Sequence, residues 1–434
     1  VLREQHMVPY DVPGAYLQGV ATKTELILLR PPREFRTWDE RGVEIYWLMQ
    51  VPLYGQADSG AIWNRTVNEF ATSEPPTGCG FGRCPQEPCV YSKAPDGDDS
   101  RVTMPLYVDD GRLYWDPTPE ASKAVTADKQ RLKTRFGIEF GEDDPSSDYF
   151  LGANRQSSRR DVAKISATSY IDLMVKRYLP DADLSKFPAS WSYTPADESL
   201  VSLWEAMSMS RPASSPELTK SFGSLFGALL HATKYRPETM AALGLLGSCL
   251  SFPSQELYDV HLVRVLVYLA RTRCLGVTYS KHAENAARLR AFADSNWAVT
   301  RSTTGYTIML AGAGIGSVSR RQHCISMSSC EAELNALAEC AIELLHVSAT
   351  LAFIGHRQDS AIECFTDNKA AYDLCHRFTS AQNSRHIDRK MFKMRELRGA
   401  GVVTVAHVGT EFNPADLFTK ILSRQPFEKH RKTV

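Results

Sequence analysis

The chain has 434 residues, of which 43% are hydrophobic and 10% aromatic. This composition is ordinary for packed globular cores, excludes a disordered chain and leaves room for two or three domains. The 50 basic and 50 acidic residues give zero formal charge, which argues against nucleic acid coating the whole surface but not against a local basic track. No apolar run reaches the roughly 18 residues of a membrane span, so we expect no membrane partner. The ten cysteines are scattered, which favours an intracellular, reducing setting.

Short apolar runs alternate with turn signals from the start of the chain to about residue 155. This pattern predicts an α+β region with strands at 6–11, 44–49 and 103–108. Helical periodicity then extends from about residue 169 to about residue 277, and the Ser/Pro-rich stretch 208–217 within it predicts an exposed loop.

The pattern changes again near residue 288, where an α/β region is predicted. Its expected elements are a strand at 288–294, two strands within 303–319, a long helix from Glu331 to about Ile354, a strand at 362–367, helices, a strand at 401–408 and a last helix from about Pro414.

Two adjacent aspartates, Asp109 and Asp110, lie between apolar flanks in "LYVDDGRLY". Asp-Gly is a common hairpin signal, so 109–111 is the predicted hairpin turn, and turn chemistry alone would explain the pair. A third carboxylate, Asp11, ends the predicted strand in "VPYDVPGAYLQG", and Tyr16 follows in a turn or short helix. Carboxylates in these positions suit two Mg²⁺ ions about 3.5–4 Å apart, which in a polymerase palm activate the primer hydroxyl and hold the nucleotide phosphates.

Four more carboxylates follow the strand, helix, strand, helix order of the last region. Asp294 ends a strand in "AFADSNWA", Glu333 lies in the first turns of a helix in "SSCEAELNALAE", Asp367 ends a strand in "CFTDNKAA", and Asp416 opens the last helix in "EFNPADLFTK". Taken singly, the two helix-start charges have a structural explanation, since they favour the helix macrodipole by roughly a few tenths of a kcal/mol. Taken as an ordered quartet, the four predict a second metal site.

In their order, the N-terminal motifs resemble the reverse transcriptase of copia-type (Pseudoviridae) retrotransposons. The segments that carry the resemblance are "DVPGAYLQG", "PLYGQADSGAIW", "LYVDDG", "DYFLGA", "ISATSYIDLMVKRYL" and "LFGALLHATKYRPE". The resemblance implies that Asp11, Asp109 and Asp110 bind the metals and that Tyr16, which taken alone would be a core aromatic, excludes a ribose 2′-hydroxyl. Asp58 stands where the family usually has a nucleotide-contacting Gln, and its negative charge implies a weakened polymerase.

The last region resembles the ribonuclease H domain of the same elements. "RSTTGYTIML", "SRRQHCISMSSCEAEL" and "SRHIDRKMF" carry the resemblance, and the family's Glu-Leu-x-Ala setting falls on Glu333 rather than on Glu331. The resemblance implies a mixed five-stranded sheet in which Asp294, Glu333, Asp367 and Asp416 bind Mg²⁺, with Mn²⁺ as a substitute.

Three further features have two explanations each. The helix around 385–398 carries Arg385, Arg389, Lys390, Lys393, Arg395 and Arg398. These residues form either a solvated face or a track that grips hybrid phosphates, chiefly through Arg389 and Lys393. His407 precedes Asp416 at a distance similar to that of the mobile histidine of some ribonucleases H, but core packing also explains it. Cys79, Cys84 and Cys89 lack a nearby fourth ligand and predict no zinc site.

We therefore expect a fragment of a copia-type Pol polyprotein, with a reverse transcriptase palm at 1–155 that lacks the fingers, thumb and connection helices at 156–286, and a ribonuclease H-like domain at 287–434. The expected function is RNA-directed DNA polymerase and RNA–DNA hybrid ribonuclease, with an RNA template, a hybrid and deoxynucleoside triphosphates as partners and an impaired polymerase half. The alternative is a non-catalytic transposon remnant that at most binds nucleic acid. The expected location is the cytoplasm, in a virus-like particle, or the nucleus.

Overall fold

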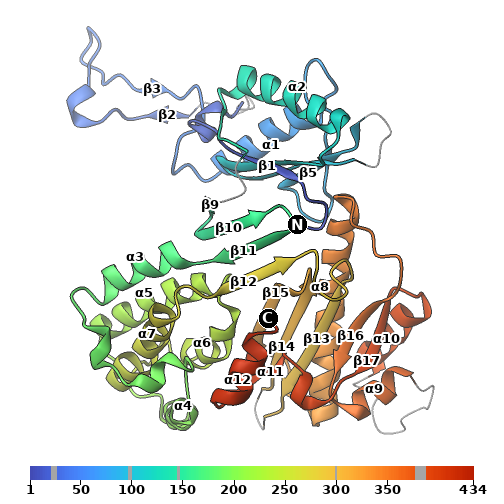
Figure 1. Cartoon of the computed structure of the whole chain (residues 1–434). Coiled ribbons are helices and arrows are strands. Elements are labelled where there is room, and N and C mark those ends of the chain that lie inside the picture. The colour runs from blue at the N-terminus through green and yellow to red at the C-terminus, as the bar shows by residue number, and fades with distance from the viewer. Residues whose placement is uncertain (21–26, 96–99, 144–146, 299–300, 377–387) are drawn as a thin grey trace. The chain divides into compact units, whose positions relative to one another are not determined.

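The structure is a computed structural model that describes residues 1–20, 27–95, 100–143, 147–298, 301–376 and 388–434. Its strands and helices form two compact units (Figure 1). The N-terminal unit comprises Glu4–Asp144 with Phe353–Gly355, and the C-terminal unit comprises Val1–Arg3, Pro145–Ala352 and His356–Val434. The expected mixture of α and β structure is confirmed, whereas the domain boundaries near 155 and 286 stay predictions.

The N-terminal unit contains a six-stranded antiparallel sheet in the order β4-β5-β6-β7-β1-β8. Its strands are β1 (His6–Asp11), β4 (Gly82–Arg83), β5 (Val90–Lys93), β6 (Val102–Tyr107), β7 (Asp110–Trp115) and β8 (Glu139–Phe140). Helices α1 (Ser59–Thr72) and α2 (Pro119–Phe136) share one buried cluster with this sheet. Helix α2 begins where Thr118 accepts a hydrogen bond from the Ala121 amide and ends at Gly137 in the left-handed region.

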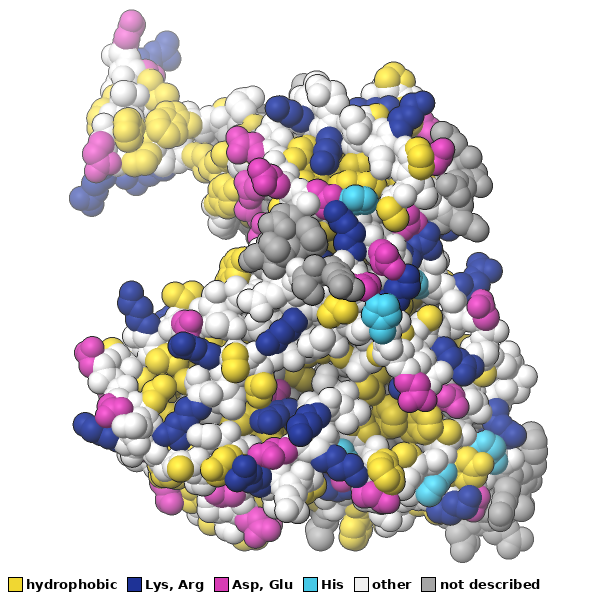
Figure 2. All heavy atoms as spheres, viewed as in Figure 1, with side chains coloured by type: hydrophobic (Ala, Val, Ile, Leu, Met, Phe, Trp, Pro, Cys, Tyr) yellow, Lys and Arg dark blue, Asp and Glu magenta, His cyan; other side chains and the backbone are white. Residues whose placement is uncertain are grey.

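A hairpin extends from this unit and contains the two short strands β2 (Leu28–Leu29) and β3 (Trp47–Leu48) (Figure 1). Only Trp47–Leu48 of the strand predicted at 44–49 is strand. Figure 2 shows hydrophobic side chains gathered on this hairpin, and Trp38 there is 59% exposed. The alternation of apolar residues therefore does not report a buried face here, which explains the shortened strand. The 3₁₀ turns η1 (Ala15–Gln18) and η2 (Arg33–Phe35) complete the unit.

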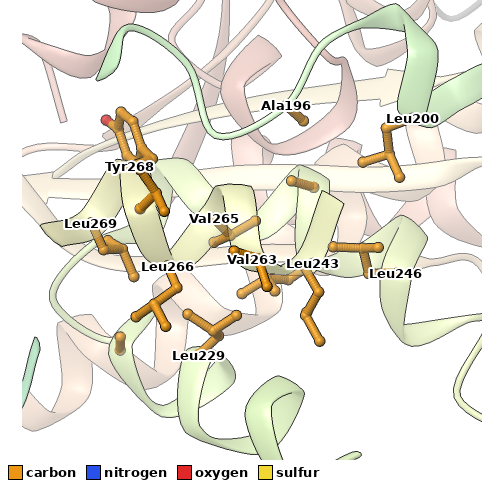
Figure 3. Packing of buried hydrophobic residues seen from close by; sticks show 14 of the residues in the cluster. Ala196, Leu200, Leu229, Leu243, Leu246, Val263, Val265, Leu266, Tyr268 and Leu269 are labelled. Atoms are coloured by element: carbon orange, nitrogen blue, oxygen red, sulfur yellow. The ribbon is translucent and has the colours of Figure 1, made fainter. Parts of the chain in front are cut away.

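The C-terminal unit begins with an antiparallel sheet in the order β12-β11-β10-β9 and a helical cluster. The strands are β9 (Ser147–Phe150), β10 (Ala153–Arg159), β11 (Val162–Ser166) and β12 (Gly276–Ser280). The helices are α3 (Thr168–Tyr178), η4 (Leu184–Lys186), η5 (Ala189–Ser192), α4 (Glu198–Ser210), α5 (Pro216–Ala232), η6 (Pro237–Thr239), α6 (Met240–Gly247), the π-helix η7 (Leu257–Leu262) and α7 (Val263–Arg271). Figure 3 shows Leu229 of α5, Leu243 of α6 and Leu266 of α7 in one buried cluster.

The predicted loop at 208–217 is shorter than expected. Helix α4 continues to Ser210 and ends at Arg211, which adopts a left-handed conformation with φ 41°. Ser215 then accepts a hydrogen bond from the Leu218 amide and begins α5, with Pro216 at its first position. The Ser/Pro-rich composition therefore marks two helix ends that lie close together.

The rest of the C-terminal unit is built on a five-stranded mixed sheet in the order β15-β14-β13-β16-β17. The strands are β13 (Arg290–Asn296), β14 (Thr303–Leu310), β15 (Ala313–Arg321), β16 (Ile362–Thr366) and β17 (Val403–His407). The helices are α8 (Ser329–Phe353), α9 (Lys369–His376), α10 (Asp388–Gly399), η8 (Thr410–Phe412), α11 (Asp416–Thr419) and α12 (Arg424–Arg431). Strands β13, β16 and β17 are parallel, and β14 and β15 are antiparallel to their neighbours.

Both faces of strand β13 are buried. Ala291 and Ala293 belong to the cluster that includes α8, whereas Phe292, pointing the other way, belongs to the cluster that includes Leu417 and Phe418 of α11. A strand covered on both sides carries a continuous apolar run instead of an alternating one. This accounts for "AFA" immediately before Asp294.

Two expectations for this region are corrected. The last helix is divided into α11 and α12, because a continuous helix would place the ring of Pro426 against the carbonyl of Leu422. Helix α8 is also long and apolar enough to cross a membrane by length and composition, although no such stretch was expected. One such helix is weak evidence for a membrane span, because the face of α8 that includes Leu337 packs into a buried cluster of the sheet, and core helices pass the same test.

Candidate active sites

Three of the predicted carboxylates meet at one edge of the five-stranded sheet. Asp294 lies in β13, Asp367 directly follows β16, and Glu333 lies in the early turns of α8. Phe292 of β13 pairs with Phe365 of the parallel strand β16. Asp294 and Asp367 each follow two residues later, so the same register places them side by side. Oxygen atoms from the three carboxylates all lie within 4.8 Å of one another, and no other such group of His, Cys, Asp or Glu occurs among the described residues. We call these three residues the acidic triad.

Two members of the acidic triad are deeply buried, and the third, Asp367, is half-buried. Asp294 is 1% exposed and Glu333 is 6% exposed. Burial, followed by the charges of Asp294 and Asp367, raises the pKa of Glu333 to about 9. Burial also raises the pKa of Asp294 to about 6, against a lowering by Lys420. Oε1 of Glu333 accepts a hydrogen bond of 3.2 Å from the Ser295 amide, but Oε2 has no hydrogen-bond partner among the described residues.

This arrangement fits a divalent cation. A buried oxygen without a partner costs free energy, and a group of hard oxygen ligands is the donor set that Mg²⁺ and Mn²⁺ prefer. A cation would also offset the mutual repulsion that keeps protons on these carboxyl groups. The residues that would hold it are Asp294, Glu333 and Asp367.

Asp416 lies beside the acidic triad. Asn413 donates a hydrogen bond of 3.1 Å to the Ala293 carbonyl and so fastens the turn before α11 to β13. Asp416 is 6% exposed, and burial raises its pKa, against a lowering by Lys420. The Lys420 ammonium lies 2.6 Å from Oδ1 of Asp416 and 3.3 Å from Asp294.

Lys420 and Thr419 are site residues that sequence reasoning missed. The Thr419 hydroxyl donates a hydrogen bond to Asp294. Burial lowers the pKa of Lys420, but the negative charges of Asp294 and Asp416 raise it by a larger amount, so the net shift of the pKa is upward. The available signal was the spacing in "ADLFTK", because residues four apart on a helix face each other.

Glu331 and Glu333 have different surroundings. Oε2 of Glu331 accepts a hydrogen bond of 2.7 Å from the Met327 amide, and the Glu331 amide donates to the Ser328 hydroxyl at 3.1 Å. These contacts close the first turn of α8 in the manner of a capping box. Glu331 therefore serves the helix end, and Glu333 is the residue that reaches the triad.

The N-terminal carboxylates share the end of a different sheet. Asp11 of β1 pairs directly with Asp110 of β7, and the Asp109 carbonyl accepts a hydrogen bond of 2.9 Å from the Val12 amide. Burial, followed by the charges of Asp109, Asp110 and Glu139, raises the pKa of Asp11. The residues lie together although nearly a hundred positions separate them in the chain. Their oxygen atoms are spaced more widely than those of the acidic triad.

The hairpin turn lies one residue earlier than predicted. Tyr107 pairs with Asp110, so Val108 and Asp109 form the turn and Gly111 belongs to β7. Val108 has φ 57°, which is rare for a β-branched residue, and its carbonyl accepts a hydrogen bond of 2.7 Å from Nε1 of Trp63. The Asp-Gly signal was misleading because this glycine has a packing role within the strand.

Comparison with known proteins places these two sites in context. No family model matches the chain. The chain is 25% identical to a retrovirus-related Pol polyprotein from transposon RE1 of Arabidopsis thaliana over 423 residues, which are 96% of this chain and 26% of that protein. It is 25% identical to the corresponding polyprotein from transposon TNT 1-94 of Nicotiana tabacum over 438 residues, with 98% and 30% of the two chains covered. The chain is a homologue of copia-type Pol polyproteins.

This Pol homologue spans about a quarter of the length of the curated relatives that it matches. Its fold is similar to that of the foamy viral protease-reverse transcriptase solved in complex with RNA/DNA hybrid, with a TM-score of 0.51 and 12% sequence identity. That match covers 94% of this chain and 45% of the viral chain. The sequence relatives confirm the resemblance to copia-type Pol polyproteins stated from the sequence, and the viral structure shows a similar fold.

Tyr16 of the Pol homologue lies in η1 next to the Val108 turn. Its ring packs against Tyr54 at a centroid distance of 5.0 Å. It is half-buried and lines a cavity of about 180 Å³ together with Trp63 and Val108. Asp58 is exposed at the start of α1, and its side chain makes no capping hydrogen bond there.

His407 ends β17 and lies beside the acidic triad. Its Nε2 donates a hydrogen bond of 3.2 Å to the Asp367 carbonyl, and the side chain is exposed, so it does not pack in the core. Cys79 and Cys84 are buried free thiols, and the described residues place no zinc ligand set around them.

The basic helix α10 has a mixed character. Arg389 and Lys393 are exposed, and Lys393 forms an ion pair of 3.3 Å with Glu396. Lys390 instead donates a hydrogen bond of 2.6 Å to Asn335 of α8. At least one cation of the predicted track therefore joins two helices. The predicted Arg385 and His386 lie outside the described residues.

Proposed function

We propose that the chain is the reverse transcriptase and ribonuclease H portion of a retrotransposon Pol polyprotein and that it cuts the RNA strand of RNA–DNA hybrids. The observation that supports this most strongly is the acidic triad with the unpartnered Oε2 of Glu333. Three converging carboxylates, two of them buried, are costly when Lys420 pairs with only one of them, and a functional cation is the physical reason to keep them.

In this proposal, Asp294, Glu333, Asp367 and Asp416 hold two Mg²⁺ ions, with Mn²⁺ as a substitute. When bound, the ions would supply an activated water and stabilise the departing 3′-oxygen. Asp367 is the least buried of the triad and would face the incoming strand, while the buried Asp294 and Glu333 would fix the direction of the ligand set. His407 beside Asp367, with Arg389 and Lys393 on α10, would contact phosphates of the hybrid. Selectivity for the hybrid would come from duplex shape and from 2′-hydroxyl contacts.

The N-terminal carboxylates support an RNA-directed DNA polymerase of the same element. Asp11, Asp109 and Asp110 would hold Mg²⁺, and Tyr16 would pack against the sugar of an incoming deoxynucleoside triphosphate. The exposed Asp58 adds negative charge near the triphosphate, so we propose that this half is the weaker one. The palm at 1–155, the thumb and connection at 156–286 and the ribonuclease H domain at 287–434 remain part of this proposal.

The test is cleavage of an RNA–DNA hybrid by the full chain in Mg²⁺. Asp367→Asn should reduce cleavage at least about a hundredfold, because a neutral amide is a poor bridge to a cation, while hybrid affinity stays the same or rises as repulsion from phosphate falls. The control is Asp373→Asn on α9, a carboxylate paired with Lys369 outside the triad, which should leave cleavage unchanged. A folded wild-type chain that binds the hybrid and leaves it uncut would support the non-catalytic remnant instead.

A further inference from the structure

A lysine divides the four carboxylates of the C-terminal site into two different halves. The Lys420 ammonium lies between Asp416, at 2.6 Å, and Asp294, at 3.3 Å. Both carboxylates are largely buried, with 9% of the Asp416 side chain and 2% of the Asp294 side chain exposed. By contrast, 35% of the lysine side chain is exposed. Glu333 also adjoins Asp294, and its Oε2 has no hydrogen-bond partner in the part of the chain that the structure describes. One half of the site thus contains a cation from the protein itself, and the other half lacks one.

The lysine and a divalent ion cannot share the half between Asp294 and Asp416. Mg²⁺ binds oxygen ligands at about 2.0–2.1 Å. An ion between Asp294 and Asp416 would need carboxylate groups that already face the Lys420 ammonium, which lies 2.6 Å from Oδ1 of Asp416 and 3.3 Å from Asp294. An ion at that place would lie within a few ångströms of the ammonium group, where two positive charges repel strongly in a partly buried site. Binding of an ion there requires the ammonium to leave.

The lysine side chain is suited to leave. It is a compact charge on a flexible four-carbon stem, and its exposed part gives it a route to solvent. Thr419 next to it would keep its own hydrogen bond to Asp294 when Lys420 swings away, so Asp294 stays oriented. A nucleic-acid phosphate would offer the released ammonium a new negative partner.

We propose that Lys420 is an internal cation that occupies the second ion position of this site, between Asp294 and Asp416, until a phosphate of the substrate draws it away. The inference rests on the proposed function, because it assumes that the quartet binds divalent ions. At low concentrations of the divalent ion the free protein then binds one ion here, on the acidic triad. The second ion enters only at higher concentrations, and nucleic acid lowers the concentration that it needs. Lys420 is a positioning residue in this scheme.

The first test counts Mn²⁺ ions bound to the full chain by electron paramagnetic resonance, without nucleic acid. A background of Asp109→Asn and Asp110→Asn removes the other carboxylate pair. The chain with Lys420 should bind one ion at this site, and Lys420→Met should bind two, with the affinity for the second ion raised at least about tenfold. Lys420→Arg keeps a cation and should bind one. Lys369→Met on α9 removes a lysine that pairs with Asp373 and should also bind one.

The second test needs no substitution and so does not depend on the folding of Lys420→Met. The rate of reductive methylation of Lys420 in the wild-type chain is followed by mass spectrometry as Mn²⁺ is added. The rate should stay low while the first ion binds and rise at least about tenfold at the higher concentrations that load the second position. A rate that is high without metal, or that Mn²⁺ does not change, overturns the inference.

The two proposals fail in different ways. If no ion binds to the chain, or if Glu333→Gln does not abolish its binding, the ion site and the proposed function both fail. If one ion binds and Glu333→Gln abolishes its binding, but Lys420→Met adds no second ion, only the role of Lys420 is overturned. Hybrid cleavage is not measured in either test, so the result does not depend on whether the chain is an active nuclease.

Discussion

Gly111 of β7 lies so close to the ring of Tyr10 on β1 that a Cβ atom at position 111 would stand 2.0 Å from Cζ of Tyr10. Tyr10 is 3% exposed and belongs to the main cluster of the N-terminal unit, so its ring has little room to move. Gly111→Ala should therefore lower the free energy of unfolding of this unit by about 1–3 kcal/mol, measured by urea denaturation.

The control for this substitution is Gly223→Ala in α5, where nothing lies within 4 Å of the added Cβ. In a helix interior the change should raise stability by about 0.5–1 kcal/mol. If Gly111→Ala were as well tolerated as Gly223→Ala, the glycine would have no packing role and the Asp-Gly turn would again explain it.

Trp63 holds the strained Val108 turn through its indole nitrogen. Trp63→Phe keeps most of the packing but leaves the Val108 carbonyl without this donor, which should cost about 1–3 kcal/mol of unfolding free energy. Trp47→Phe on the exposed hairpin, where the tryptophan is 46% exposed, should change stability by less than about 0.5 kcal/mol. Equal effects of the two substitutions in chemical denaturation would show that the hydrogen bond is unimportant.

The metal-free stability of the C-terminal unit should fall as the pH rises. The pKa values of Asp294 and Glu333 are raised from 3.8 and 4.5 to about 6 and about 9, so the folded state binds more protons than the unfolded chain between these values. Stability then decreases with pH from about 4 to about 9. Glu333→Gln should remove most of this slope and be at least about 1 kcal/mol more stable than wild type at pH 8 in a chelator. A flat wild-type profile in thermal unfolding would contradict the assignment.

Two lysines of α10 should behave differently because only one is bonded to α8. Lys390→Met breaks the hydrogen bond to Asn335, a buried amide that also donates to Gln322 and Ser326 at 3.0 Å. It should lower the free energy of unfolding by about 1–2 kcal/mol. Lys393→Met should change stability by less than about 0.5 kcal/mol but reduce the salt dependence of hybrid binding by about one phosphate contact. If Lys393→Met lowered stability and Lys390→Met changed only the salt dependence, then Lys393 would be the structural lysine and Lys390 the phosphate contact.

The strands and helices around both sites could be predicted largely from the sequence. Alternation or continuous apolar runs predicted β1, β6 and β13, and the long helix predicted from Glu331 to about Ile354 is α8, which begins at Ser329. The juxtaposition of Asp294 with Asp367 followed from two strands that each end in a carboxylate. Such patterns are local, and parallel pairing then brings their ends together.

Other features depend on contacts that no local pattern reports. The turn lies at Val108 and Asp109, one residue earlier than predicted, because the ring of Tyr10, a hundred positions away, leaves no room for a side chain at Gly111 in the strand. Lys420 lies in the site because the hydrogen bond from Asn413 holds the start of α11 against β13, which places the end of the helix beside Asp294. In both cases the deciding interaction joins residues far apart in the chain, which periodicity and capping rules do not see.

The most direct test of the central claim is the chemistry of the RNA ends produced from an RNA–DNA hybrid by the full chain in Mg²⁺. Attack by water with departure of the 3′-oxygen should leave 5′-phosphate and 3′-hydroxyl ends, only on the RNA strand and not with Asp367→Asn or a chelator. Products with 2′,3′-cyclic phosphate ends, equal cutting by Asp367→Asn, or an uncut hybrid bound to the folded wild-type chain would each contradict the account.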